Sequence, residues 1–483
     1  MLDDIKILGK HSFIYGIGLI LVKGIGFFLI PLYTHFIPPA DYGVLEMLDL
    51  MGYFLGNIIG LGIDQALFKF YHSPEYGKER HAILSTGIIG TSIFGIFIIT
   101  MLMPFSEQIS YYVMGDVEYS NLIIIFFIAF LISAILNMNR AILRVQNRSI
   151  LFSSVLIANA LVTILLNIYF VAILKLGIRG IIYSAIIGST IFTLFLTGLQ
   201  IRDLGVLFKR EIFIKMLKYG FPFVPAGIFA FILNWSDRYF LRIYSDMESI
   251  GLYALGFKIG MIIVFLINMP FSFIWNAYLF EIQKKHNNGE IYARISTYYL
   301  FILCFFGLGI SIFSQEIIQI IAAKEYINSY KIIPFITTAM IFMCLETVFQ
   351  VGLLIEGKSS TLAIVKGMAA CVCVILNVIL IPMYDRIGAA IAVTISFFIC
   401  SLAILHYSQR AHKIPFEYLK LVKIYLIAVC VYIISTICIF NTPWLNTFAK
   451  IIIFILFPIC IYLLKCINQE EIKYMINNII KVN

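Results

Sequence analysis

Long apolar runs separated by short polar segments recur along the whole chain. Most runs have about 20 residues, which is enough for an α-helix to cross a hydrocarbon core of roughly 30 Å. The alternation of apolar and polar residues that marks a transmembrane β-strand is absent. The pattern predicts an all-α polytopic membrane protein with about 14 transmembrane helices, at residues 12–33, 43–68, 82–103, 120–139, 150–174, 180–201, 213–236, 250–275, 292–313, 332–355, 361–382, 387–407, 421–440 and 446–466.

The composition agrees with this class. Of 483 residues, 61% are hydrophobic and 13% are charged. The polar connections are short, so we expect no appended soluble domain, and no Gly-x-x-x-x-Gly-Lys-[Ser/Thr] loop for ATP occurs. The first apolar run is too long for a signal peptide and lacks a small-residue cleavage site. We therefore expect neither an ATP-driven pump of that kind nor a cleaved leader.

Basic residues gather on one side of the predicted membrane. When alternate connections are assigned to opposite sides, the side with both termini collects most of the lysines and arginines, from Lys6 to Lys481. Because Lys and Arg stay in cytoplasmic loops, we predict that both termini face the cytoplasm. The net charge of +9 then follows from topology and indicates no nucleic-acid partner.

Two halves of the chain resemble each other. Gly43 in PPADYGVLEML aligns with Gly251 in MESIGLYALGF, and Gly180 aligns with Gly388 at the same separation. Two six-helix repeats have the same orientation, which predicts two lobes related by a pseudo-two-fold axis along the membrane normal. The predicted domains are 1–205 and 206–410, followed by 411–483, which adds two helices and a cytoplasmic tail. We expect transport, although a duplication without functional consequence is the alternative.

Ionisable residues inside the predicted spans are candidates for a cavity, because a charge exposed to lipid is costly. Lys23 lies near the middle of the first span. The second span has a small, polar face, which carries Asp49, Gly56, Asn57, Gly60 and Asp64. The glycines favour close helix packing. Asp49 is equally consistent with lining a cavity or with neutralising Lys23.

The other intramembrane charges leave alternatives open. Arg140 and Arg144 end the fourth span, and are either topology signals at the headgroups or cavity residues. Glu346 in the tenth span is either a substrate-facing acid or a buried acid bonded to a neighbour. Lys258 in the eighth span either lines the cavity or pairs with Asp237.

Prolines indicate hinges in the helices that start the two lobes. Pro31 lies in the first span, and Pro222 and Pro225 lie in the seventh. Proline removes a backbone hydrogen bond and permits a bend. Many membrane helices carry prolines without such a role, so the hinge is an expectation only.

Cysteine and histidine predict no metal site and no cofactor. The 9 cysteines fall in apolar runs in the second half of the chain. Cys371 and Cys373 point in different directions on a helix and have no histidine nearby, so we interpret them as packing residues. No histidine pair suggests acid–base chemistry, and we expect no enzyme activity.

One stretch resembles a known family. NWSDRYFLRIYSDMESIGLYALGFKIG, residues 234–260, is similar to the signature of the bacterial polysaccharide flippases (Wzx-type) of the multidrug/oligosaccharidyl-lipid/polysaccharide (MOP) superfamily. In that family an Asp-Arg pair ends the seventh helix. The stretches GIGLILVKGIGFFLIPLYTHFIPPADYGVLEMLDL and LNVILIPMYDRIGAAIAVTIS resemble the family's first two helices and its eleventh-to-twelfth connection.

The resemblance implies a function. It predicts that the chain moves undecaprenyl-diphosphate-linked oligosaccharides across the bacterial inner membrane by alternating access, for O-antigen, capsule or exopolysaccharide biosynthesis. Lys23, Asp237, Arg238 and Lys258 would be the cavity charges. The chain has few further basic residues in the interior of the first lobe, so binding of the diphosphate could depend on Arg140 and Arg144. Expected partners are the lipid-linked glycan, membrane lipids, and a polysaccharide polymerase with its assembly proteins.

Two other functions are weaker alternatives. A cation-coupled multidrug antiporter of the same fold would require a cavity dominated by acidic residues. The predicted cavity of this chain contains both acidic and basic residues. A membrane glycan polymerase would want a large extracytoplasmic loop, and the longest outer connections are short. The sugars, the driving ion and the pathway are not specified by the sequence.

Overall fold

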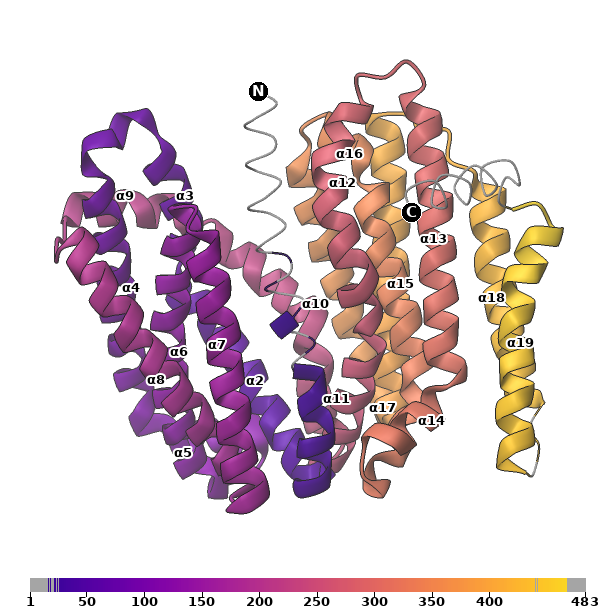
Figure 1. The fold of residues 1–483 in the computed structure, drawn as a ribbon, viewed down its shortest axis with the longest axis horizontal. Helices are drawn as coiled ribbons and strands as arrows, with labels where there is room; N and C mark the ends of the chain where they lie inside the picture. Colours follow the sequence, from indigo (N-terminus) through magenta and orange to yellow (C-terminus); the bar gives the residue numbers. More distant parts are fainter. Residues whose placement is uncertain are drawn as a thin grey trace. The chain divides into compact units, whose positions relative to one another are not determined.

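The computed structural model describes residues 16, 18, 21, 22, 24, 26–438, 440 and 442–466. By their contacts the residues form two compact units. The first unit holds residues 1–254 and 377–385, and the second holds 255–376 and 386–483. Within the described ranges all regular structure is helical (Figure 1). The predicted boundaries of the sequence repeats, at residues 205 and 410, remain predictions.

The helices follow one another with short connections. Up to the start of the second unit they are α2 (Pro39–Gly60), α3 (Ile63–His72), η1 (Pro74–Glu79), α4 (Arg80–Leu102), η2 (Met103–Phe105), α5 (Ser106–Met114), η3 (Val117–Tyr119), α6 (Ser120–Val145), α7 (Ser149–Asn167), η4 (Ile168–Ile173), α8 (Gly177–Leu204), α9 (Arg210–Gly220), α10 (Phe223–Tyr244) and α11 (Met247–Gly260). The rest are η5 (Val264–Asn268), α12 (Met269–Ile282), α13 (Asn288–Ile312), α14 (Ser314–Ile321), η6 (Lys324–Ile332), α15 (Ile333–Phe349), α16 (Val351–Ile355), α17 (Ser359–Ala411), α18 (Tyr418–Ile437) and α19 (Pro443–Leu463).

The membrane-spanning helices agree with the predicted runs. Over the described residues, 11 helices are long and apolar enough to cross a membrane, or 12 when the bent pair α9 and α10 is one span. Ser360–Ala411 is 52 residues long and contains two predicted runs. A single crossing needs only about 20 residues, so this segment is long enough for two. The short apolar helix Gly26–Phe36 is the described end of the first predicted run. The prediction of a polytopic all-helical membrane protein is confirmed.

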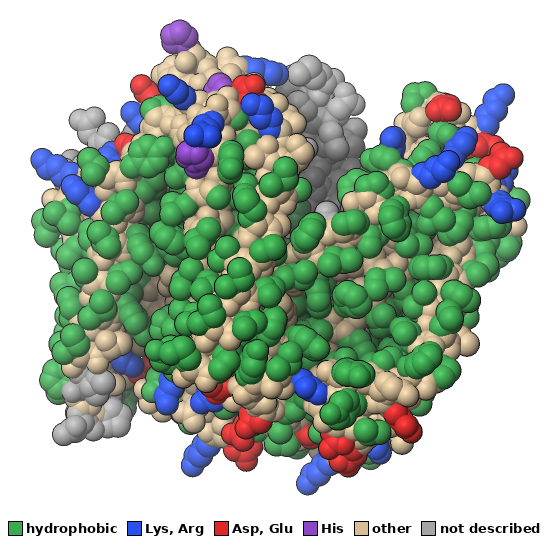
Figure 2. All heavy atoms as spheres, turned by 180° about the vertical axis from the view of Figure 1, so that it is seen from behind, with side chains coloured by type: hydrophobic (Ala, Val, Ile, Leu, Met, Phe, Trp, Pro, Cys, Tyr) green, Lys and Arg blue, Asp and Glu red, His purple; other side chains and the backbone are tan. Residues whose placement is uncertain are grey.

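The surface has the polarity of a membrane protein. Figure 2 shows hydrophobic side chains over the middle of both parts of the chain, with charged side chains gathered towards the ends of the helices. Many of the exposed side chains are large and apolar, including Phe28, Leu194 and Ile274. Such extensive apolar exposure is what a hydrocarbon environment stabilises.

Helix α2 begins and ends at residues suited to those places. Pro39 is its first residue, where the missing N–H costs nothing. The helix stops at Leu61 and Gly62, which have φ of 48° and 65°. Two successive left-handed residues cannot continue an α-helix, so α3 starts again at Ile63. One long apolar segment is thus broken into two helices.

The first unit has an apolar core between α3, α4, α6 and α9. Ile63 and Leu67 of α3, Ile83 of α4 and Ile142 of α6 are fully buried there. Met216 of α9 enters the same cluster. Helix α9 is therefore held against α3 and α4, and the chain bends by 46° before it continues as α10.

A reciprocal glycine contact joins α2 and α11 within the first unit. A Cβ atom on Gly43 would lie 2.0 Å from the carbonyl oxygen of Met247, and one on Gly251 would lie 1.9 Å from that of Pro39. Gly43 and Gly251 are the residues that align between the sequence repeats, and so are Pro39 and Met247. The contact has the two-fold form expected of two equivalent helices that cross at a symmetry axis.

The break in α17 is fixed by side chains of the α10–α11 turn. Asp385 has φ 51° and ψ −135°, which is not helical. Its carboxylate accepts hydrogen bonds from Ser245 Oγ at 2.6 Å and Ser249 Oγ at 2.9 Å. These bonds stabilise a backbone conformation that a residue other than glycine rarely adopts.

The two C-terminal helices pack within the second unit. Helix α18 lies against α13, and α19 lies against α18 and α13. Phe454 and Phe457 of α19 contact Phe305 and Phe301 of α13. Lys450 of α19 donates to Glu316 of α14 at 2.6 Å. Ring packing and a shielded ion pair together hold α19 in place.

Candidate functional site

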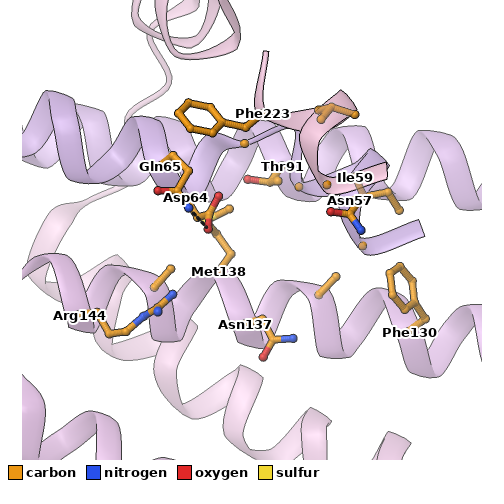
Figure 3. Close-up of a pocket in the computed structure, with 17 residues that line it drawn as sticks. Asn57, Ile59, Asp64, Gln65, Thr91, Phe130, Asn137, Met138, Arg144 and Phe223 are labelled. Atoms are coloured by element: carbon orange, nitrogen blue, oxygen red, sulfur yellow. Dashed lines mark hydrogen bonds between the residues drawn. The ribbon is translucent and has the colours of Figure 1, made fainter. Parts of the chain in front are cut away.

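A pocket lies in the first unit where α2 and α3 meet α6 and the start of α10. Its volume is about 450 Å³. Figure 3 shows Asp64 and Arg144 on facing helices, with Phe223 and Phe130 at different places along the wall. The pocket opens beside the break between α2 and α3 and beside the bend between α9 and α10. Broken membrane helices are a recurrent feature of transporter binding sites.

Glycines both open this pocket and hold its walls. A Cβ on Gly60 would meet no atom within 4 Å, so this face of α2 borders open space. In contrast, a Cβ on Gly62 would lie 2.3 Å from the carbonyl oxygen of Gly220. The two helix interruptions therefore touch backbone to backbone. Close helix packing was expected for Gly56 and Gly60, but both line the pocket instead.

Helix α6 supplies the facing wall. Phe130, Asn137 and Arg144 follow each other at intervals of seven residues and therefore share one face of the helix. Ala134 and Ala141 lie between them on the same face. Small residues alternating with large or polar ones leave a groove along α6, which the pocket occupies.

The pocket wall carries one acid and one base. Asp64 of α3 accepts from Gln65 Nε2 at 3.4 Å. Arg144 lies near the rings of Phe68 and Phe152, at 5.9 and 6.0 Å from their centroids. Among the described residues no ion pair joins Arg144 to an acid. The guanidinium is exposed towards the pocket, where it can meet an anionic or hydroxyl-bearing ligand.

The Asp237–Arg238 pair belongs to a separate, buried cluster. Arg238 is 2% exposed, and it donates to Glu46 at 3.1 Å and to Asp237 at 2.9 Å. Tyr253 donates to Asp237 at 2.5 Å. The guanidinium also lies 4.7 Å from the ring centroid of Trp235. The cluster joins α2, α10 and α11, and in this conformation the Arg238 guanidinium is enclosed by protein groups.

Sequence reasoning missed Glu46, the partner of Arg238 on another helix. Glu46 is 1% exposed and lies in the second predicted span. An acid inside an apolar run is a visible signal. Asp49 was singled out instead. It lies three residues further on and is exposed. Which of the two acids turns inward depends on the rotation of α2, which the sequence does not fix.

Other predicted residues lie near the pocket or outside the described part. Arg140 donates to Asn137 at 3.4 Å, and its buried Nε has no hydrogen-bond partner among the described residues. Pro222 and Pro225 flank the start of α10, at the bend. Pro31 lies in Gly26–Phe36, where its carbonyl accepts from Thr34 and His35. Lys23 lies outside the described residues.

The second unit contains Lys258 and Glu346. Lys258 is half-buried in α11. Glu346 of α15 is buried, and Lys366 of α17 lies 3.4 Å from its Oε2. A neighbouring base is thus present, as one of the two interpretations expected. Lys366 was not singled out from the sequence, because it lies near the start of a span where a lysine is common.

Within the residues that the structure describes, no group of three or more His, Cys, Asp and Glu side chains is arranged to hold a metal ion. Cys371 is exposed and Cys373 is buried, as expected for neighbours that point to different sides of one helix. Polar groups in the pocket are amides, a hydroxyl, a carboxylate and a guanidinium. Such groups bind polar ligands by hydrogen bonds.

The fold resembles those of solved flippases and transporters. A lipid II flippase, MurJ, in an inward closed conformation superposes with a TM-score of 0.76 at 18% identity, over 93% of this chain and 98% of that one. An inward-facing multidrug resistance MATE family transporter of the MOP superfamily gives a TM-score of 0.65 at 13% identity, over 80% of this chain and 94% of that one. At these identities the likeness shows the two-lobe fold alone.

The family is shown by sequence. Residues 8–282, more than half of the chain, match the family model described as "Polysaccharide biosynthesis protein". The chain therefore belongs to this family, and the resemblance predicted from the sequence is confirmed at that level. An uncharacterized membrane protein of Methanocaldococcus jannaschii is 22% identical, over 95% of this chain and 96% of its own length. A protein of Haloferax volcanii, named "Probable low-salt glycan biosynthesis flippase Agl15", is 27% identical over 42% of this chain and 44% of its own length.

Proposed function

We propose that this protein is a flippase that moves a polyprenyl-diphosphate-linked oligosaccharide across the membrane. Membership of the polysaccharide biosynthesis family supports a role in glycan assembly. The fold shared with a lipid II flippase and the partial likeness to a glycan flippase support transport over enzyme catalysis. We propose undecaprenyl diphosphate as the carrier and the bacterial inner membrane as the site. The relatives named above are archaeal, so carrier and membrane are part of what must be tested.

The observation that carries the proposal is the pocket of the first unit. It is built from membrane-spanning helices, lies beside two helix interruptions, and has polar and charged groups on opposite walls. A cargo with a polar headgroup must be shielded from hydrocarbon while it crosses, because dehydrated polar groups are costly. A pocket between the spans, with a few polar groups on its walls, offers that shield.

The charged residues divide between two proposed roles. A lipid diphosphate carries negative charge, which lysine and arginine stabilise in a low-dielectric cavity. We propose that Lys23 and Lys258 hold the diphosphate, and that Arg140 and Arg144 steer it from the cytoplasmic end of α6. The bends at Pro222 and Pro225 would let α10 move between the inward and outward states.

The buried acids and Arg238 have a different proposed part. Because Arg238 is already neutralised by Glu46 and Asp237, we propose that this cluster holds α2, α10 and α11 together in the present conformation. A direct contact of Asp237 or Arg238 with cargo would require the cluster to open during the cycle. Asp49 and Glu346 remain proposed cavity residues.

Lys23 gives a cellular test. The test uses a strain whose chromosomal gene for this chain is deleted and which carries the gene on a plasmid. In this strain Lys23→Ala should abolish surface glycan and leave the protein level normal. Lipid-linked oligosaccharide should accumulate on the cytoplasmic leaflet at the same time, because synthesis continues while export stops. The matched control is Lys78→Ala, at an exposed lysine of η1. Normal surface glycan with Lys23→Ala would remove Lys23 from the proposed mechanism.

A further inference from the structure

The pocket of the first unit has no net formal charge. Of the residues that line it, the charged ones are Asp64 and Arg144. A diphosphate entering this space would approach a carboxylate as well as a guanidinium, so its Coulomb energy would gain little from the pair. The pocket is therefore suited to an uncharged polar group better than to the anionic part of a lipid-linked glycan.

Amide groups with unused hydrogen-bonding capacity line both walls. Asn57 of α2 donates through Nδ2 to Tyr53 O at 3.0 Å, and its Oδ1 accepts no hydrogen bond from the described residues. Asn137 of α6 accepts from Arg140 through Oδ1, and its Nδ2 makes no hydrogen bond to them. Each amide can both donate and accept. Hydroxyl and acetamido groups of a sugar need this combination.

The remaining wall gives such a ring room and apolar contacts. Gly56 and Gly60 leave the α2 side open, since a Cβ on Gly60 would touch nothing within 4 Å and one on Gly56 would only reach Phe130 at 4.0 Å. The rings of Phe130 and Phe223 add apolar surface. A mostly apolar pocket with a few placed polar groups fixes the orientation of a small ligand.

We infer that this pocket is the sugar subsite of the flippase: it binds an uncharged sugar residue next to the diphosphate, with Asn57 and Asn137 as the amides that select it. The diphosphate is held outside the pocket. The inference rests on the proposed function, because it assigns one part of that cargo to one part of the molecule. A site built to hydrogen-bond a ligand discriminates against the analogue that lacks those groups.

The test compares two lipids that differ by one sugar. Purified full-length protein in nanodiscs is titrated with undecaprenyl diphosphate and with undecaprenyl-diphosphate-linked N-acetylglucosamine. The wild type should bind the sugar-bearing lipid about tenfold more tightly, equivalent to about 1.4 kcal/mol. Asn57→Leu and Asn137→Leu should each lose most of this preference and bind the bare lipid as the wild type does. Asn121→Leu, at an exposed amide of α6 outside the pocket, should keep the preference.

Each result is informative. The two variants alter facing helices, so if one fails to fold, as shown by its thermal transition, the other still decides. Equal binding of the two lipids by the wild type, or a preference that persists in the folded variants, overturns the sugar subsite and leaves the flippase proposal standing. Binding of neither lipid by folded wild type contradicts both proposals.

Discussion

Arg238 illustrates how a charge can be kept within an apolar helix. Its guanidinium contacts two carboxylates and lies against the ring of Trp235, and Arg238, Asp237 and Glu46 are 1–2% exposed. Each of these charges would be costly alone. Together they form a buried network of ion pairs. If one member is lost, the remaining charges stay buried without an opposite charge beside them.

Arg238→Met should therefore destabilise the protein by about 3–5 kcal/mol, the usual cost of breaking a buried ion pair. Thermal unfolding in detergent micelles measures the change. Arg202→Met is the matched control, because Arg202 pairs with Asp203 while 77% exposed and should contribute at most about 1 kcal/mol. Equal stability of the two variants would contradict the closed ion-pair cluster.

The pocket residues depend on a different balance. Arg144 meets two phenyl rings at about the outer limit of a cation–π contact. Asp64 is satisfied partly by its neighbour Gln65. Neither group is enclosed as Arg238 is, so both are available to a ligand. This difference in enclosure separates groups that hold the helices together from groups that can bind cargo.

At the scale of helices, the crossing of α2 and α11 depends on two glycines. The reciprocal contact of Gly43 and Gly251 brings each helix to the backbone of the other. A Cβ atom at either position would overlap with a carbonyl oxygen of the other helix. The helices would have to separate, and the Glu46–Arg238 bond next to the crossing would be strained as well.

Gly43→Ala and Gly251→Ala should each lower stability by about 1–3 kcal/mol, the usual cost of overpacking, or by more. The two effects should be similar because the contact is nearly symmetric. Gly198→Ala on α8 is the control: a Cβ there meets nothing within 4 Å, so it should be neutral or stabilise by up to about 1 kcal/mol. Thermal unfolding of the three variants decides, and a neutral Gly43→Ala would refute the contact.

Interrupted helices group around the pocket. The α2–α3 break places Gly62 against Gly220, at the bend between α9 and α10. A movement of α10 at its bend would therefore press on the α2–α3 break and change the pocket wall. We therefore expect binding in the pocket and bending of these helices to be linked by this contact.

For the whole molecule, the sequence was sufficient for the class and most of the spans. Apolar runs long enough to cross a bilayer are a strong signal, because no soluble core could bury them. The aligned glycines Gly43 and Gly251 were visible as a repeat. Their contact with each other was not, because the alignment says that two residues are equivalent and does not say that they touch.

The site was predicted only in part. Asn57, Asp64 and Arg144 were noticed as polar residues in spans, and the structure brings them to one pocket. Asn137 and Phe130 were missed, although they lie seven and fourteen residues before Arg144 on the same face of α6. Which polar residues face a cavity and which pair with each other depends on helix rotation. Partner choice across helices, as between Glu46 and Arg238, is set by packing that periodicity does not record.

The central claim is translocation of a lipid-linked glycan, and the most direct measurement is transport in sealed vesicles. Purified protein is reconstituted with an undecaprenyl-diphosphate-linked oligosaccharide, and a membrane-impermeant lectin reports the glycan on the outer leaflet over time. The account predicts that glycan facing the lumen becomes accessible in vesicles with the protein and stays protected in protein-free vesicles. Glycan that stays equally protected in both, with the reconstituted protein folded, would contradict the account.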